Sequence, residues 1–167
     1  MRLRRRGEAF EGRPNRLAVS TSPLFQLAVA ASGIAFDDAQ RAAIVRLSAP
    51  PIHGFYLWGA VGRGKSMLSD LYYDAVPTAR KRRFHFHSFF RELQTEIAAT
   101  RQPVENSISR ILGSARVVLF DEFHVHDVAD AVYLTKTLDA LMQQGVLVLA
   151  TSNYAPDELM PNPLFHV

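Results

Sequence analysis

The feature that most constrains this chain is a glycine-rich turn placed between an apolar run and a helical pattern. Residues 54–58 are largely apolar, and the next eight match the pattern G-x-x-x-x-G-K-[ST]. These eight are Gly59, Ala60, Val61, Gly62, Arg63, Gly64, Lys65 and Ser66. Glycines let the backbone adopt positive φ and approach a ligand closely, and amides at the start of the next helix can form an anion-binding nest. We therefore predict a strand, a phosphate-binding loop and a helix in succession.

Two side chains at the end of this loop suit a nucleoside triphosphate with its metal ion. Lys65 can reach the β and γ phosphates, and the Ser66 hydroxyl is a ligand suited to Mg²⁺. We predict that ATP and Mg²⁺ bind here and that all eight loop residues contact the nucleotide. The alternative is an ordinary glycine-rich turn between a strand and a helix.

A second apolar run ends in two adjacent acids. Residues 117–120 are apolar, and Asp121 and Glu122 follow them directly. Beside a P-loop, Asp121 is expected to hold the magnesium shell and Glu122 to polarise the attacking water. A solvated acidic strand end is the alternative.

A third apolar run, at 146–151, is followed by Asn153. In a doubly wound sheet, ligands gather at the carboxyl ends of the strands. Asn153 is therefore expected to orient the water or touch the γ-phosphate, which makes Lys65, Glu122 and Asn153 the predicted catalytic residues. Asparagine is also a common turn residue, so a plain turn is the alternative.

Apolar runs separated by helical patterns predict an α/β fold with a parallel sheet covered by helices on both faces. We expect strands at 54–58, 83–87, 116–121 and 146–151. Helices are expected within 23–48, at 65–74, after a cap at Ser88, around 108–112, and between a cap at Asp127 and Gly145. Residues 1–22 are expected to be flexible, and residues 23–167 to form the core.

Charge and composition exclude some classes of site. The chain has no cysteine, which excludes disulfides and thiolate metal sites, and no apolar run near the ~18 residues needed to cross a bilayer. Its formal charge of +3 arises from six arginines in residues 1–16. The remainder is nearly neutral, so nucleic acid is not expected as a partner. The arginine-rich start is read as a solvated tail, with contact to an anionic membrane surface left open.

Four histidines lie near the predicted strand ends, in the pairs His85/His87 and His124/His126. On the strand predicted at 83–87, His85 and His87 face the same way. Convergence of both pairs could form a zinc site. The preferred interpretation is packing or hydrogen bonding near the nucleotide.

Several strings together resemble the ZapE-type AAA+ ATPases. They are L-W-G-A-V-G-R-G-K-S at 57–66, R-F-H-F-H-S-F at 83–89, F-D-E-F at 120–123, and A-T-S-N at 150–153 followed by P-D-E-L at 156–159. The resemblance runs from about residue 22 to the end and includes D-D-A-Q at 37–40. It implies that Lys65 and Ser66 belong to Walker A, Asp121 and Glu122 to Walker B, and that Asn153 is sensor 1.

The resemblance also implies a biological setting. Members of this family are cell-division ATPases with mitochondrial relatives linked to protein quality control. It implies a homo-oligomeric ring, the division protein FtsZ as a partner, and a place in the cytoplasm at the inner face of the cell membrane. Remodelling of a protein partner is the expected use of the nucleotide cycle.

Family members continue beyond the position of Val167, through the rest of the core and a helical lid. The resemblance implies that the arginine completing a neighbour's site, and the lid arginine near the γ-phosphate, lie beyond that position. An arginine finger contributes about 10³–10⁵ in rate in P-loop enzymes. The expectation is therefore a truncated core that binds ATP and hydrolyses it poorly or not at all. The alternatives to an active ATPase are a non-hydrolysing nucleotide-binding fragment, a DNA-handling AAA+ loader and, more remotely, a small-molecule kinase.

Overall fold

The computed structural model describes residues 15–125 and 128–159. In chain order its elements are α1 (Arg16–Ala31), α2 (Asp38–Leu47), β1 (Gly54–Trp58), α3 (Lys65–Ala75), β2 (Lys81–His85), α4 (Phe86–Thr100), α5 (Val104–Leu112), β3 (Val117–Asp121), α6 (Val128–Gln143), β4 (Leu147–Ser152) and a 3₁₀ turn, η1 (Pro156–Glu158). After α2, one or two helices separate each strand from the next, as the apolar runs predicted.

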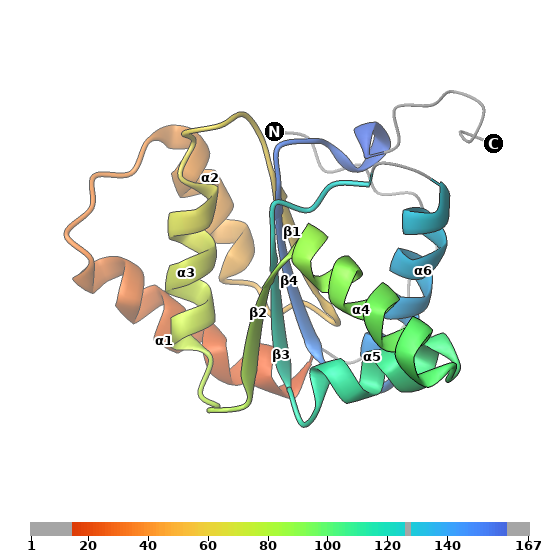
Figure 1. Cartoon of the computed structure of the whole chain (residues 1–167). Coiled ribbons are helices and arrows are strands. Elements are labelled where there is room, and N and C mark those ends of the chain that lie inside the picture. The colour runs from red at the N-terminus through yellow and green to blue at the C-terminus, as the bar shows by residue number, and fades with distance from the viewer. Residues whose placement is uncertain (1–14, 126–127, 160–167) are drawn as a thin grey trace.

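The four strands form one parallel sheet in the order β1-β4-β3-β2. Helices α1, α2 and α3 lie on one face of this sheet and α4, α5 and α6 on the other (Figure 1). The predicted α/β fold, a parallel sheet covered on both faces, is confirmed.

Alternation along the strands divides the core between the two faces. Val117 and Leu119 of β3 pack with the helices of the α1–α3 face, while Val118 and Phe120 pack with the aromatic cluster of α4. Both sets are at most 1% exposed. A strand buried on both faces must be apolar at every position, which explains why the sequence shows continuous runs rather than alternation.

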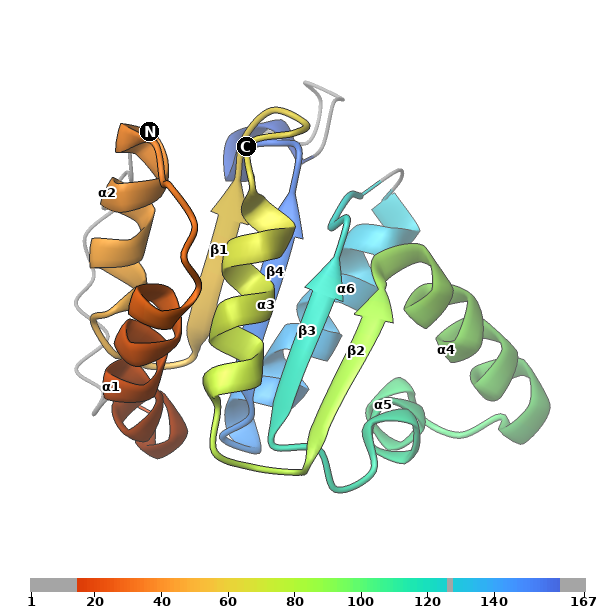
Figure 2. The same cartoon turned by 90° about the vertical axis from the view of Figure 1, so that its left-hand side faces the viewer.

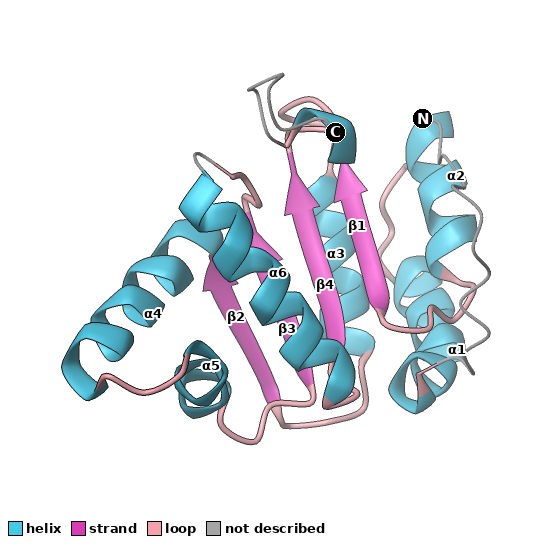
Figure 3. Ribbon diagram, turned by 90° about the vertical axis from the view of Figure 1, so that its right-hand side faces the viewer, coloured by secondary structure: helices cyan, strands magenta, loops and turns pink. Residues whose placement is uncertain are grey.

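Parallel pairing brings the carboxyl ends of all four strands to the same edge of the sheet. Figure 2 shows α3 lying across the sheet, with the loop from β1 to α3 above the strand tips, and Figure 3 shows the opposite face with α4, α5 and α6. The loops that follow β1, β3 and β4 therefore meet at one edge of the sheet. These loops carry the candidate residues predicted from the sequence.

The first helix begins earlier than expected. Helix α1 starts at Arg16 and includes residues 16–22, which the sequence had assigned to a flexible segment. The Asn15 side chain accepts a hydrogen bond from the Leu17 amide (3.0 Å) and caps the helix. Pro23 lies inside the helix. Residues 1–14, the rest of that segment, lie outside the described residues.

The second strand ends two residues earlier than expected. Strand β2 covers 81–85 rather than 83–87, and His87 lies in the first turn of α4. His85 pairs with Asp121, the last residue of β3, so the ladder has no partner for residues beyond it. Ser88 is consequently not the cap of α4, because the helix begins at Phe86. The expected cap at Asp127 lies outside the described residues, while Gly145 ends the α6 segment with φ +65° as predicted.

Candidate functional site

The P-loop (residues 59–66) leaves β1 and enters α3 without a side-chain cap. Gly62 and Gly64 have φ of +78° and +79°, which side-chain-bearing residues rarely adopt. No atom lies within 4 Å of a Cβ built on Gly62, so the loop is open on that side. Gly64 is the N-cap residue of α3, and its backbone leads directly into Lys65 and Ser66. The loop therefore presents a helix N-terminus, with its unpaired amides, to the space above the sheet.

Lys65 holds the P-loop together from inside. Its ammonium donates to the carbonyl oxygens of Gly59 (2.8 Å) and Ala60 (2.9 Å), and to Oδ1 of Asn153 (3.0 Å). Partial burial lowers the pKa of Lys65 from its ordinary value of 10.5. A cation held by neutral oxygens alone is well placed to accept a phosphate group.

A cavity of about 480 Å³ opens beside the P-loop, within the roughly 300–1,000 Å³ typical of ligand sites. Three segments line it: the P-loop with Met67, Glu122 after β3, and the end of β4 with Asn153. The cavity lining is Val61, Gly62, Arg63, Gly64, Lys65, Ser66, Met67, Glu122, Thr151, Ser152 and Asn153. The structure thus brings together Lys65, Ser66, Glu122 and Asn153, all singled out from the sequence. Gly59, Ala60 and Asp121 are not among the lining residues.

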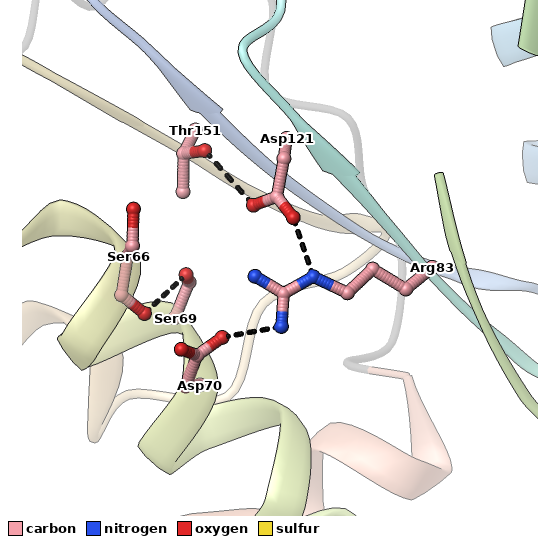
Figure 4. A network of polar contacts seen from close by, with 6 residues as sticks. All are labelled: Ser66, Ser69, Asp70, Arg83, Asp121 and Thr151. Atoms are coloured by element: carbon pink, nitrogen blue, oxygen red, sulfur yellow. Dashed lines mark hydrogen bonds and ion pairs between the residues drawn. The ribbon is translucent and has the colours of Figure 1, made fainter. Parts of the chain in front are cut away.

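Asp121 ends β3 as a buried carboxylate, 5% exposed. Its Oδ2 accepts from Nε of Arg83 at 2.5 Å, and its Oδ1 accepts from the Thr151 hydroxyl at 3.3 Å. Figure 4 shows this network from close by, with Ser66 on the neighbouring helix α3. Both oxygens of Asp121 are therefore engaged by side chains of the two adjacent strands.

Arg83 carries this network onward to α3. Its Nη1 donates to Oδ1 of Asp70 at 2.9 Å, so one guanidinium contacts two carboxylates. The hydrogen bond that Arg83 donates to Asp121 is the main reason that the pKa of Arg83 lies above its ordinary value. Neither Arg83 nor Asp70 was singled out from the sequence. The available signals were an arginine two residues before the end of β2, and an acid one helical turn after Ser66.

Glu122 follows Asp121 in a left-handed backbone conformation, with φ +55°. Such a conformation is uncommon for a glutamate and costs free energy. The next residue is held firmly: the Phe123 amide donates to the Thr151 carbonyl (2.7 Å), and the Ser152 hydroxyl donates to the Phe123 carbonyl (2.5 Å). These bonds fix the turn, and the exposed Glu122 side chain lines the cavity.

Gln40, near the start of α2, also reaches the P-loop. Its Nε2 donates to the Arg63 carbonyl at 3.2 Å, while its Oε1 accepts from the Asp37 amide at 2.9 Å. Asp37 caps the helix in return by accepting from the Gln40 amide, which completes a capping box. Helix α2 is thus hydrogen-bonded to the phosphate-binding loop, a contact that the sequence analysis did not foresee.

The residues fit the ligands predicted from the sequence. A glycine-rich helix N-terminus with a lysine suits a polyphosphate, and the open volume at Gly62 leaves room for one. Magnesium prefers oxygen ligands, often one or two from the protein with the remainder from phosphate and water. The Ser66 hydroxyl and the Asp121 carboxylate supply that donor set. The roles assigned to individual residues stay predictions.

The histidines do not form a metal centre in the described part of the chain. Across 15–125 and 128–159, no group of three or more histidine, cysteine, aspartate or glutamate side chains could hold a metal ion. His124 stacks on the Tyr154 ring, with centroids 4.5 Å apart. His126 lies outside the described residues. Within the same ranges, no helix is long and apolar enough to cross a membrane.

Solved structures with a similar fold belong to replication proteins. Domain III of the Thermotoga maritima replication initiation protein DnaA superposes with a TM-score of 0.59 at 19% identity, covering 73% of this chain and 53% of that domain. The DnaC helicase loader superposes with a TM-score of 0.54 at 15% identity, covering 78% and 79%. At such low identity these structures show the fold, that of P-loop AAA+ ATPases.

Sequence relatives are closer. The cell division protein ZapE of Escherichia coli K12 is 43% identical over 117 residues, which cover 68% of this chain and 31% of ZapE. Lactation elevated protein 1 homolog B of Danio rerio is 37% identical over 128 residues, covering 68% and 25%. The matched region thus spans about a third of the length of ZapE and a quarter of the length of the Danio rerio relative. The family model described as AFG1-like ATPase matches residues 8–167. The chain therefore belongs to the AFG1-like ATPase family of AAA+ proteins.

Proposed function

We propose that this chain binds ATP with Mg²⁺ at the P-loop and that the assembled site hydrolyses the bond between the β- and γ-phosphates. The observation that carries the proposal is the convergence on one cavity of Lys65, Glu122 and Asn153, which come from three separate elements. A glycine-rich turn with no ligand has no need of an acid and an amide from two other strand ends.

Each residue has a role that its position supports. Lys65 exchanges its contacts with two loop carbonyls for the β and γ phosphates, and the P-loop amides bind the phosphate oxygens. Asn153, released from Lys65, faces the γ-phosphate or the attacking water. Glu122 accepts a hydrogen bond from that water and orients it. The Ser66 hydroxyl and Asp121 would hold Mg²⁺, which supplies positive charge against the phosphates when bound.

A protein partner is the proposed target of the nucleotide cycle. Support comes from the 43% identity to a cell division protein, although the matched region spans only 31% of it. Assembly into a homo-oligomeric ring, FtsZ as the partner and a place in the cytoplasm at the membrane's inner face follow the same resemblance. Direct binding of purified FtsZ to the chain, with and without ATP, would test the partner.

Nucleotide binding is tested first by Lys65→Ala. We expect this substitution to abolish binding of a fluorescent ATP analogue in the presence of MgCl₂, because the cation that faces the phosphates is lost. Lys81→Ala is the matched control, since Lys81 also binds two backbone carbonyls, those of Tyr73 and Asp74, but at the far end of α3. Unchanged affinity in Lys65→Ala would disprove the P-loop assignment.

Hydrolysis is tested separately by Glu122→Gln. The substitution is expected to leave ATP affinity within about twofold and to reduce phosphate release by on the order of 10² or more, in line with loss of a general base. If the unsubstituted chain binds Mg-ATP but shows no turnover, the chain is a nucleotide-binding unit without hydrolysis. Turnover that persists unchanged in Glu122→Gln would remove the proposed catalytic role.

A further inference from the structure

Arg83, which is not among the residues that line the cavity, links the candidate metal ligand Asp121 to helix α3. Arg83 of β2 contacts Asp121 of β3 through Nε and Asp70 of α3 through Nη1 (Figure 4). Among the ion pairs of the described residues, the Arg83–Asp121 pair has the most buried carboxylate, with an Asp121 side chain 8% exposed.

The position of Arg83 follows from register and helix period. Arg83 pairs with Leu119 and lies one pleat repeat before His85, the partner of Asp121. Residues two apart on a strand share a face, so Arg83 lies on the α3 face, as Asp121 does. Asp70 follows Ser66 by four residues and therefore lies on the same side of α3, one turn further along. The guanidinium consequently lies between Asp121 and the side of α3 that carries Ser66 and Asp70.

We propose that Arg83 is a positioning residue that acts as the internal counterion of Asp121 and keeps free divalent cations out of the site, so that the metal ion enters together with nucleotide. The inference rests on the proposed function in one respect, namely that Asp121 is a metal ligand.

The physical argument is a competition for one carboxylate. A buried, unpaired carboxylate is costly, and the guanidinium satisfies it when no metal ion is present. A divalent cation arriving alone must displace Arg83 or approach it closely, and like charges repel strongly where solvent screening is weak. A cation that arrives with a triphosphate brings compensating negative charge. The Arg83 side chain is 44% exposed, so it can move toward solvent when displaced.

The test is a titration of the full chain with Mn²⁺ in the absence of nucleotide, followed by electron paramagnetic resonance of the free ion. We expect weak Mn²⁺ binding to the unsubstituted chain and roughly tenfold tighter binding to Arg83→Gln. A tenfold gain is a modest part of the repulsion that one nearby positive charge exerts on a cation in a partly shielded site. The matched control is Arg82→Gln. It removes the same charge from the same strand, but Arg82 lies over the Phe84 ring rather than beside Asp121. We expect no change in that control.

Two further variants assign the effect to the pair. Adding Asp121→Asn to Arg83→Gln should abolish the gained Mn²⁺ affinity, because the carboxylate is then absent. Arg83→Lys keeps the charge but cannot fork between two carboxylates, so we expect a rise smaller than that of Arg83→Gln. A purely structural role for Arg83 would lower stability in denaturant unfolding without raising metal affinity. If Arg83→Gln does not fold, the same titration on Arg83→Lys decides the question.

Unchanged or weaker Mn²⁺ binding in Arg83→Gln, or a gain that survives Asp121→Asn, would overturn the inference. Its failure is distinguishable from that of the proposed function because the titration contains no nucleotide. Normal ATP binding without a metal gain in Arg83→Gln removes the Arg83 inference alone. A metal gain in a chain that never binds ATP removes the proposed function alone.

Discussion

Glu122 is one of two residues other than glycine, Arg101 being the second, that have a positive φ in the described part of the chain. A left-handed conformation at Arg101 has an ordinary reason, because Arg101 is the C-cap of α4 and its amide bonds to the Ile97 carbonyl. Glu122 ends no helix, and its conformation is imposed by the bonds that hold Phe123 against β4. Strain of this kind concentrates where a side chain must be aimed. Here it directs Glu122 toward the cavity.

We expect Glu122→Asn to be more stable than Glu122→Gln by about 0.5–1 kcal/mol in free energy of unfolding, because asparagine tolerates the left-handed region better. Both variants remove the same charge from an exposed position, so the difference isolates the backbone. Urea unfolding followed by circular dichroism measures it. Equal stability of the two variants would mean that the turn is not strained.

At the scale of elements, α2 matters because its first turn is tied to the P-loop. The capping box between Asp37 and Gln40 fixes the Gln40 side chain, which bonds to the Arg63 carbonyl. A helix that looks peripheral in sequence thus buttresses the phosphate-binding loop. The D-D-A-Q string at 37–40, noted for its family resemblance, has this structural meaning.

Asp37→Ala is expected to lower the free energy of unfolding by about 1 kcal/mol, the usual cost of losing an N-cap side chain. Asp38→Ala is the matched comparison. It removes the neighbouring acid, whose ion pair with Arg41 is exposed to solvent, so a much smaller change is expected. Chemical denaturation of the two variants measures both effects. Equal losses would show that the capping box does not stabilise α2.

At the scale of the whole molecule, nucleotide should stabilise the fold, because the site joins β1, α3, β3 and β4. A ligand that binds only the folded state, present at a free concentration of 100 times its Kd, adds about 2.7 kcal/mol to the free energy of unfolding. For a chain of this size we expect Mg-ATP to raise the Tm by roughly 5–10 °C, measured by differential scanning fluorimetry. EDTA should reduce the shift, and Lys65→Ala should remove it. The same shift in Lys65→Ala would mean that the nucleotide binds elsewhere.

Much of the fold could be predicted because its signals are local. The glycines of the P-loop and the continuous apolar runs of β1, β3 and β4 act through backbone conformation and burial, which neighbouring residues determine. The start of α1 and both ends of β2 were predicted wrongly. Asn15 caps α1 ahead of residue 23, where the sequence pattern indicated a start. Strand β2 stops where its partner strand stops, which depends on pairing rather than on local pattern.

The sequence by itself determined which residues could bind a phosphate and in which order the strands and helices follow. Only the tertiary structure decided their partners. Lys65 meets Asn153 across 88 positions, and Arg83 meets Asp121 across 38. The physical reason is register: parallel pairing aligns strand ends that are far apart in the chain, and the side chains that become neighbours there have no shared local pattern. The P-loop was therefore evident from the sequence, whereas the arginine beside its candidate metal ligand was not.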